Sequence, residues 1–247
     1  MQRYFIEVFY NGANYSGFQI QQNAKSIQAE IEKALKIFFK EDFNLTGSSR
    51  TDAGVHALSN FFHFDSEAVT FLDAIKLNKC VYNLNAILPD DIVVKRIFLT
   101  SPDAHCRFNA ISREYKYHIY KGKDPFQADR AYYYPYKLDM DLLQKAAAII
   151  SSYNDFTSFS KRNTQVSNFH CTIIKSNWTM ENDQLIYNVQ ANRFLRGMIR
   201  GLVGTMLKVG TGKISINDFI GIMNAKDCSL ADFAVPPQGL FLVQVQY

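Results

Sequence analysis

The sequence lacks any apolar run approaching the ~20 residues that a membrane-spanning helix needs. Its N-terminal segment already carries Arg3 and Glu7, and charges placed so early do not fit the apolar region of a secretory signal peptide. We therefore expect a soluble protein of the cytoplasm with no membrane partner.

Cysteine motifs are also missing. No two cysteines share a Cys-x-x-Cys spacing, so neither a zinc site nor a thioredoxin-like motif is indicated. We expect small, reduced core residues at all four positions: Cys80, Cys106, Cys171 and Cys228.

Several common catalytic patterns are absent as well. The segment Gly210-Thr211-Gly212-Lys213 lacks the spacing of a phosphate-binding P-loop. There is no Gly-x-Ser-x-Gly nucleophile elbow and no His-x-x-x-His pair that would favour a metal site. The sequence therefore predicts neither a metal nor a cofactor.

The composition is that of a folded globular protein. Of 247 residues, 47% are apolar and 20% charged, which is enough to build a sizeable core. The net charge of +4 permits an anionic partner without demanding one.

Periodicity predicts an α+β fold with antiparallel sheets. Alternating apolar residues predict strands at residues 3–10, 58–64, 92–99, 106–120, 171–180, 184–191 and 240–245. A helical period predicts helices after the capping residues Ser26, Asp139 and Ser215, after a capping box at 70–73, and from about Phe194 to Val209. We place a domain boundary near residue 100, which gives one lobe over residues 1–100 and another over residues 101–247.

The turn before residues 58–64 has an unusual composition. Residues 47–57 read Gly-Ser-Ser-Arg-Thr-Asp-Ala-Gly-Val-His-Ala. Arg50 lies two positions from Asp52, so a permanent cation stands near a potential nucleophile in a segment whose glycines allow sharp bends. The alternative is a hairpin whose Arg and Asp are simply solvated, and composition alone favours that simpler interpretation.

Two further segments can carry chemistry. Tyr115 and Tyr117 are two apart on a predicted strand, so they share a face that can stack under a nucleobase. The alternative is a pair of core tyrosines, which the many aromatic residues of the chain favour.

The predicted helix from Phe194 is both basic and rich in glycine. Arg193, Arg196 and Arg200 follow an i, i+3, i+7 spacing that predicts one shared face. A second stripe contains Gly197, Gly201 and Gly204, and a helix that tolerates such a stripe usually lets another group approach its backbone. The alternative is a solvated basic face. The glycine stripe argues against it, because a helix that faces only solvent does not need glycine at these positions.

Residues 49–57 closely resemble the signature of the tRNA pseudouridine synthase A (TruA) family. The resemblance continues, in the same order, along almost the whole chain. Further similar segments are residues 10–19, 85–89, 107–110 with 115–117, 154–159, 198–200 and 237–242. The chain departs from the family pattern at three places. Asn11 and Phe18 replace the more usual Asp and Trp, and Ser48-Ser49 replaces a small Ala-Gly pair. We expect these departures to affect packing and RNA contacts and to remove no catalytic group.

The resemblance implies a pseudouridine synthase fold: two ferredoxin-like α/β lobes with antiparallel sheets joined around a central basic cleft. It implies cofactor-free isomerisation of uridine to pseudouridine at positions 38, 39 and 40 in the anticodon arm of tRNA, by a homodimer. Asp52 matches the catalytic nucleophile, Arg200 its salt-bridge partner, Arg50 the residue that helps extrude the nucleotide, and Tyr115 the tyrosine that stacks on the flipped base. We add Arg193 and Arg196 as expected tRNA-binding residues. On this interpretation Asp52 is buried and paired with Arg200.

Two alternatives stay open. A non-catalytic RNA-binding protein on the same scaffold would lose the equivalent of Asp52, which this sequence keeps. A synthase of shifted specificity would act on other tRNA positions or other RNAs, and the departures from the family pattern are compatible with it.

Overall fold

The computed structural model describes residues 1–67, 74–162 and 166–247. The chain forms two compact units. Unit 1 comprises Met1–Ile111 and Phe241–Tyr247, and unit 2 comprises Ser112–Leu240. The division thus falls after Ile111 rather than near residue 100, and the C-terminal strand returns to unit 1.

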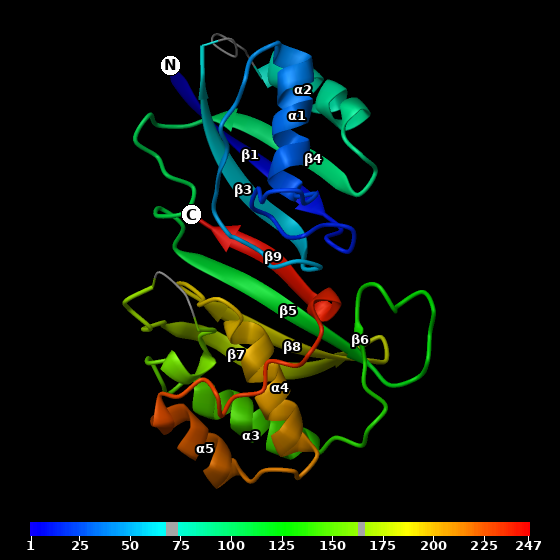
Figure 1. Ribbon diagram of the computed structural model, residues 1–247, viewed down its shortest axis with the longest axis vertical. Helices are drawn as coiled ribbons and strands as arrows, with labels where there is room; N and C mark the ends of the chain where they lie inside the picture. The colour runs from blue at the N-terminus through cyan, green and yellow to red at the C-terminus, as the bar shows by residue number, and fades with distance from the viewer. Residues whose placement is uncertain (68–73, 163–165) are drawn as a thin grey trace. The chain divides into compact units, whose positions relative to one another are not determined.

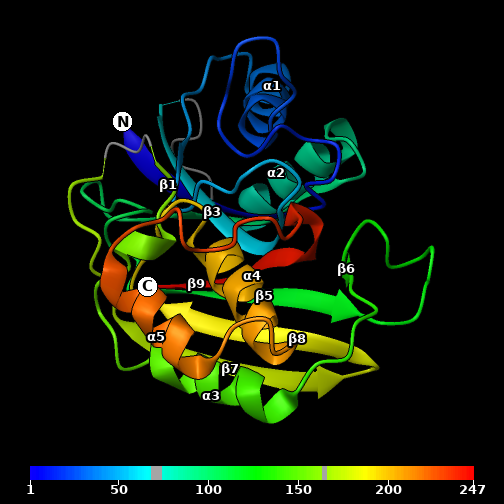
Figure 2. The ribbon, with the colours of Figure 1, turned by 60° about the horizontal axis from the view of Figure 1, so that its bottom comes forward.

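Unit 1 consists of a sheet and two helices. Its elements are β1 (Gln2–Tyr10), α1 (Ile27–Phe39), β2 (Thr46–Gly47), β3 (His56–Ser66), α2 (Ala74–Ile87), β4 (Ile92–Leu99) and β9 (Leu240–Gln246). The strand order is β4-β1-β3-β9, with β2 paired to β3. β1 is antiparallel to both β3 and β4, whereas β9 runs parallel to β3. Figure 2 shows both helices on one side of these strands.

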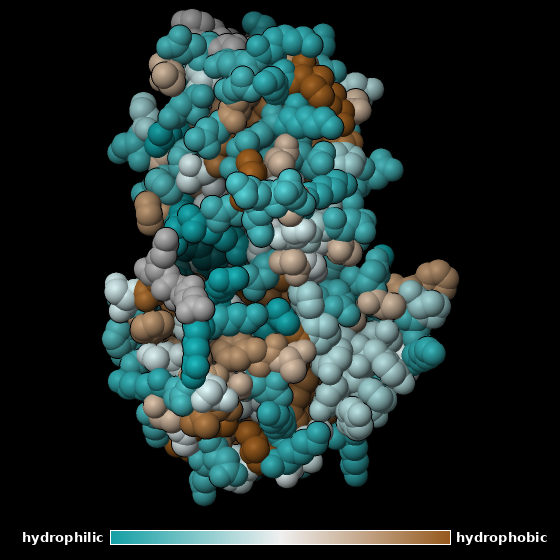
Figure 3. Space-filling model, in the orientation of Figure 1, coloured by the Kyte–Doolittle hydropathy of each residue, from teal (hydrophilic) through white to brown (hydrophobic). Residues whose placement is uncertain are grey.

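The helix α1 begins where its cap was predicted. The Ser26 side chain accepts a hydrogen bond from the backbone N–H of Ala29, and Ile27, Ile31 and Leu35 fill the buried face. Some apolar residues remain outside: Ile75 on α2 is 81% exposed. Figure 3 shows apolar side chains reaching the surface where α1 and α2 lie.

The long strands of unit 2 pair antiparallel, and helices lie on one face of them (Figure 2). Its elements are β5 (Ser112–Tyr120), β6 (Tyr132–Tyr133), α3 (Met140–Ile150), η1 (Thr157–Phe159), β7 (Ile173–Glu181), β8 (Gln184–Ala191), α4 (Met198–Gly210), α5 (Ile216–Ala225) and η2 (Pro237–Gly239). The order is β5-β8-β7, all antiparallel, and β6 adds in parallel to β5. The chain is therefore a mixed α/β protein whose strand pairs are mostly antiparallel.

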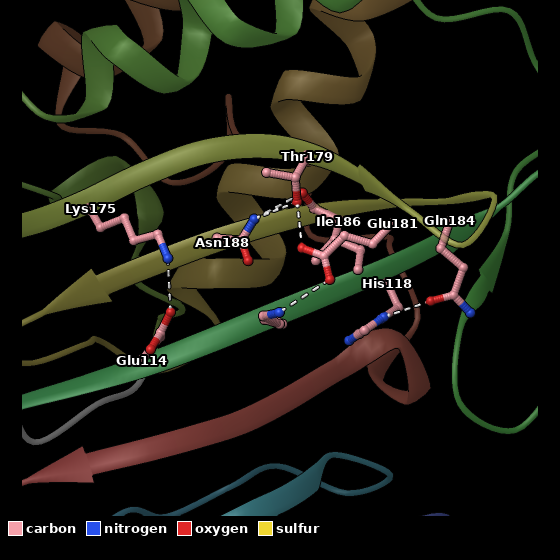
Figure 4. A network of polar contacts seen from close by, with 9 residues as sticks. Glu114, His118, Lys175, Thr179, Glu181, Gln184, Ile186 and Asn188 are labelled. Atoms are coloured by element: carbon pink, nitrogen blue, oxygen red, sulfur yellow. Dashed lines mark hydrogen bonds and ion pairs between the residues drawn. The ribbon is translucent and has the colours of Figure 1, made fainter.

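The two faces of the unit 2 sheet differ in chemistry. On one face two ion pairs reach across β8 from β7 to β5 (Figure 4): Lys175 to Glu114 at 3.1 Å and Glu181 to Lys116 at 3.5 Å. The His118 ring on β5 also lies 2.8 Å from Gln184 on the neighbouring strand β8. The opposite face carries Tyr115 and Tyr117, as the alternation predicted. Tyr117 is fully buried and donates to the backbone carbonyl of Pro236 at 2.7 Å.

Two predicted boundaries were wrong. β5 begins at Ser112 and not at residue 106, because residues 101–109 form turns closed by backbone hydrogen bonds such as Asn109 N–H to His105 O at 3.0 Å. α4 begins at Met198 and not near Phe194, because Gly197 adopts a left-handed conformation (φ 74°) that a continuing helix cannot contain. The capping box predicted at 70–73 lies outside the described residues. None of the helices within the described ranges has the length and apolar character that crossing a membrane requires.

Candidate active site

The loop between β2 and β3, residues 48–55, carries Arg50 and Asp52 and is held by backbone hydrogen bonds at several points. The N–H of Ser48 donates to the Phe61 carbonyl at 2.7 Å, and the Thr51 carbonyl accepts from the Phe18 N–H at 3.1 Å. The N–H of Gly54 reaches the Tyr15 carbonyl at 3.3 Å. The loop is therefore tied both to β3 and to residues 15–18.

A buried amide lies directly beneath this loop. The Asn60 side chain on β3 is fully buried. Its Oδ1 accepts from Ser48 Oγ at 2.8 Å, while its Nδ2 donates to the Ser49 carbonyl and the Tyr10 hydroxyl, both at 3.2 Å. The Tyr10 hydroxyl also lies 2.8 Å from Thr51 Oγ1, and burial raises the pKa of Tyr10 to about 12, so this phenol stays neutral. Side chains on both sides of Arg50 are thus anchored.

Close backbone contact explains the glycines of the segment 10–19. A side chain at Gly12 would collide with the carbonyl oxygen of Val55. Gly17, with φ +104°, brings its backbone against Thr51 and Ala53. Residues 10–19 therefore support the backbone of the loop that carries Arg50 and Asp52.

The departures from the family pattern are accommodated by local contacts. Phe18 is buried and packs on Phe62 with ring centroids 4.7 Å apart. The Asn11 side chain accepts from the Ala13 N–H at 3.1 Å, the short turn that an Asp can also form. Ser48 takes part in the Asn60 contacts. In unit 1 these departures change packing and hydrogen bonding and leave Arg50 and Asp52 in place.

Among the described residues, neither charged side chain of the loop takes part in these buried contacts. Arg50 is exposed, and over the described part of unit 1 its guanidinium has no ion-pair partner. Asp52 is half-buried, short of the full burial predicted. A rigid backbone thus carries a cation and a carboxylate that remain accessible, which is the arrangement a binding or catalytic loop requires.

Unit 2 contains the other two predicted catalytic residues. Tyr115 is 9% exposed, and the ring of Phe194 meets it edge-on at 5.2 Å. The Arg200 guanidinium donates from Nε to the Val235 carbonyl at 2.7 Å and from Nη2 to the Phe233 carbonyl at 3.4 Å. These bonds use two of its five N–H donors, so the side chain is oriented and retains donors for a carboxylate. The pairing of Arg200 with Asp52 stays a prediction.

The glycines of α4 serve the same segment that Arg200 binds. A side chain at Gly201 would strike the ring of Phe233, and one at Gly204 would strike the carbonyl of Asp232. The expectation that a group approaches this helix closely is confirmed, and the group is the chain's own segment at 232–233.

The predicted basic face of this helix was wrong. Arg193 and Arg196 precede Met198, where α4 begins, so they do not share a helical face with Arg200. Arg193 is half-buried and Arg196 exposed. The Arg196 carbonyl accepts from the Lys161 N–H at 3.0 Å, which links it to a cavity of about 300 Å³ lined in part by Lys161, Arg162 and Lys226. Basic side chains therefore line this cavity, but they lie outside α4 and not along one face of it.

Sequence reasoning missed the buried anchors of the loop. Tyr10, Thr51 and Asn60 were not singled out, although Ser59 and Asn60 are consecutive polar residues between Leu58 and Phe61. A buried amide in a strand needs partners, and that requirement points toward the adjacent turn.

Comparison with known proteins shows the family of the chain. A family model described as tRNA pseudouridine synthase matches residues 153–247. Over its full length the chain is 43% identical to the tRNA pseudouridine synthase A of Parabacteroides distasonis and 42% identical to that of Bacteroides fragilis, covering 96% and 97% of those proteins. It is 40% identical to the enzyme of the same name from a Geobacillus species over 96% of this chain and 95% of that protein. The chain belongs to the tRNA pseudouridine synthase A family, whose members are isomerases.

Proposed function

We propose that this enzyme converts uridine to pseudouridine at positions 38, 39 and 40 of the tRNA anticodon arm, with Asp52 as the nucleophile. The observation that carries the proposal is the loop that bears Asp52, whose backbone is anchored by Asn60 and the segment 10–19 while the carboxylate stays accessible. Full-length relatives that carry the name tRNA pseudouridine synthase A support it.

The reaction needs no redox partner, because substrate and product are isomers. The N1–C1′ glycosidic bond breaks, the uracil rotates, and a C5–C1′ bond forms. The proton that leaves C5 is balanced by the proton that N1 gains. An ionised carboxylate at Asp52 can serve this sequence by attack at C1′, by attack at C6 or by deprotonation of C2′.

Three residues would assist Asp52. Arg50, exposed on the same anchored loop, is suited to contact RNA and help extrude the target nucleotide. Tyr115 would stack on the flipped base, supported from the side by Phe194. Arg200, oriented by the Val235 carbonyl, would pair with Asp52 and keep it ionised.

Loop cations supply a surface for the tRNA backbone. We assign Arg193 and Arg196 to tRNA binding, together with Lys161, whose N–H bonds to the Arg196 carbonyl, and Arg162, which follows Lys161. In this proposal two ferredoxin-like lobes enclose a basic cleft, the enzyme is a homodimer of the cytoplasm, and RNA spans both subunits.

Substitution of the nucleophile tests the proposal. Asp52→Asn keeps the size of the side chain and removes its charge, so we expect the single-turnover rate of pseudouridine formation to fall about 10³-fold or more. The tRNA dissociation constant should change by no more than about threefold, since phosphate contacts supply most of the affinity. Asp42→Asn is the matched control, because Asp42 is an exposed carboxylate of unit 1 that pairs only with Lys36 among the described residues.

Mapping the product tests the position. Pseudouridine at 38, 39 and 40 in tRNA incubated with the purified enzyme is the expected result. Modification confined to other nucleotides would mean a synthase of shifted specificity. Turnover that survives in Asp52→Asn would show that another group is the nucleophile.

A further inference from the structure

Away from the Asp52 loop, unit 1 holds a compact group of three potential metal ligands. His63 lies on β3, while His105 and Cys106 follow β4 in the segment that leads out of the unit. One ring nitrogen of each histidine and the thiol sulfur all lie within 4.8 Å of one another. No local sequence motif reveals the group, because His63 and Cys106 are 43 positions apart in the chain.

The distances suit a small tetrahedral cation. Zn–N bonds of about 2.0 Å and Zn–S bonds of about 2.3 Å place tetrahedral N and S ligands roughly 3.5 Å apart. His63 Nδ1 lies 3.2 Å from Cys106 Sγ, and the two imidazole centroids lie 4.7 Å apart. Only a small inward movement of the half-buried His105 ring would complete a three-ligand site.

The present partners of these atoms are hydrogen-bonding groups of the chain. The Cys106 thiol donates to the Thr46 carbonyl at 3.0 Å, a bond that is lost when the thiol gives up its proton. His63 Nδ1 accepts from the Cys106 N–H at 3.3 Å, and His105 Nδ1 accepts from the Arg107 N–H at 3.1 Å. Bonds at the long end of the normal range leave the nitrogen lone pairs available to a stronger Lewis acid.

The surrounding charges allow a cation. Two permanent cations lie near the group. Arg3 donates from Nη1 to the Ala104 carbonyl at 3.0 Å, and Asp65 neutralises it through two bonds, from Nε at 2.8 Å and from Nη2 at 2.7 Å. Arg107 follows Cys106, and its guanidinium lies over the Phe108 ring at 5.6 Å.

We propose that His63, His105 and Cys106 bind one Zn²⁺ ion, with a fourth position left to a water molecule. On binding, the Cys106 S–H bond breaks, the proton passes to solvent and an S–Zn bond forms. Ligands of mixed N and S type favour Zn²⁺ over Mg²⁺ or Ca²⁺, which prefer oxygen. The ion would tie residues 105–106 to the middle of β3, so its role is to stabilise unit 1 rather than to take part in the isomerisation.

Cobalt provides a direct test. The purified full-length protein is treated with a chelator, dialysed and titrated with Co²⁺ alone and then with Zn²⁺ alone. We expect one equivalent of Co²⁺ to give a near-ultraviolet thiolate-to-metal charge-transfer band that Zn²⁺ abolishes. Saturating Zn²⁺ should raise the Tm by about 4 °C or more.

Variants assign the ligands. Cys106→Ala and His105→Gln should each weaken binding at least tenfold, with the charge-transfer band absent in Cys106→Ala. Cys80→Ala removes a buried thiol outside the cluster and should bind as the parent does. If Cys106→Ala fails to fold, His105→Gln, altered at a half-buried position, still decides the matter. Absence of stoichiometric binding, or a band that persists in Cys106→Ala, would overturn the proposal.

Discussion

Removing the amide of Asn60 should uncouple the Asp52 loop from β3. Asn60→Ala deletes the acceptor of Ser48 Oγ and of the Phe61 N–H, at 2.8 and 2.9 Å, and the donor to the Ser49 carbonyl. The Tyr10 hydroxyl keeps its contact with Thr51, and the Phe61 N–H keeps Ser48 Oγ as an acceptor at 3.4 Å. Two buried groups, the Ser48 hydroxyl and the Ser49 carbonyl, therefore lose their main partner. At about 1–3 kcal/mol for each such group, the free energy of unfolding should fall by about 2–6 kcal/mol.

The catalytic effect should exceed what stability alone explains. A shift of about 1 Å in a positioned catalytic group costs about 10²-fold in rate, so the single-turnover rate of folded Asn60→Ala should fall by that factor. The tRNA dissociation constant should stay within about threefold of the parent value, because phosphate contacts are untouched.

Urea denaturation and single-turnover pseudouridine formation provide the two readouts. Asn188→Ala is the matched control: Asn188 is a buried asparagine of β8 that donates to Thr179 Oγ1 at 2.9 Å, in the other unit. It should lose stability and keep the rate. If folded Asn60→Ala turned over at the parent rate, the loop would not depend on this amide and the reasoning would be refuted.

The remaining predictions concern unit 2. Gly204→Ala should lower the free energy of unfolding by about 3 kcal/mol, because the new methyl group meets a backbone carbonyl, whereas Gly221→Ala in α5, with open space around it, should raise it by up to about 1 kcal/mol; urea midpoints compare the two. Burial raises the pKa of Asp155, but the bond from Lys226 and its other hydrogen bonds outweigh burial and lower the pKa to about 2. The folded pKa thus lies below the unfolded one, so the stability that the charge contributes is present above about pH 4 and is lost toward pH 2. Asp155→Asn should therefore be less stable than the parent by about 1–2 kcal/mol at neutral pH and equal to it near pH 2, and a difference independent of pH would contradict this. Arg196→Ala should reduce the slope of log K for tRNA against log salt by about 1; an unchanged slope would mean that this arginine contacts no phosphate.

Much of the fold follows from local chemistry. The side chains of Ser26, Asp139 and Ser215 accept from the backbone at the starts of α1, α3 and α5, as their types and positions predicted. The alternation along residues 3–10 likewise located β1, whose apolar residues Tyr4, Ile6, Val8 and Tyr10 are all buried.

Errors arose where a tertiary contact overrides a local pattern. Residues 193–197 have helical spacing, yet Gly197 takes a left-handed conformation and α4 starts after it. The anchoring of Ser49 by Asn60 joins residues 11 apart, and the His63–Cys106 contact joins residues 43 apart. A single sequence states which side chains need partners but not which partners they find.

The return of β9 to unit 1 has a consequence for biosynthesis. During translation residues 1–111 emerge first, but β3 gains its parallel neighbour only after the whole of unit 2 has left the ribosome. The Tyr247 ring contacts Phe5 and Phe61, and its hydroxyl donates to the Cys106 carbonyl at 2.7 Å. This residue also follows unit 2 in the chain. Until then the first-made unit exposes a strand edge and an aromatic surface, so the nascent chain is a candidate client for a chaperone that shields apolar segments.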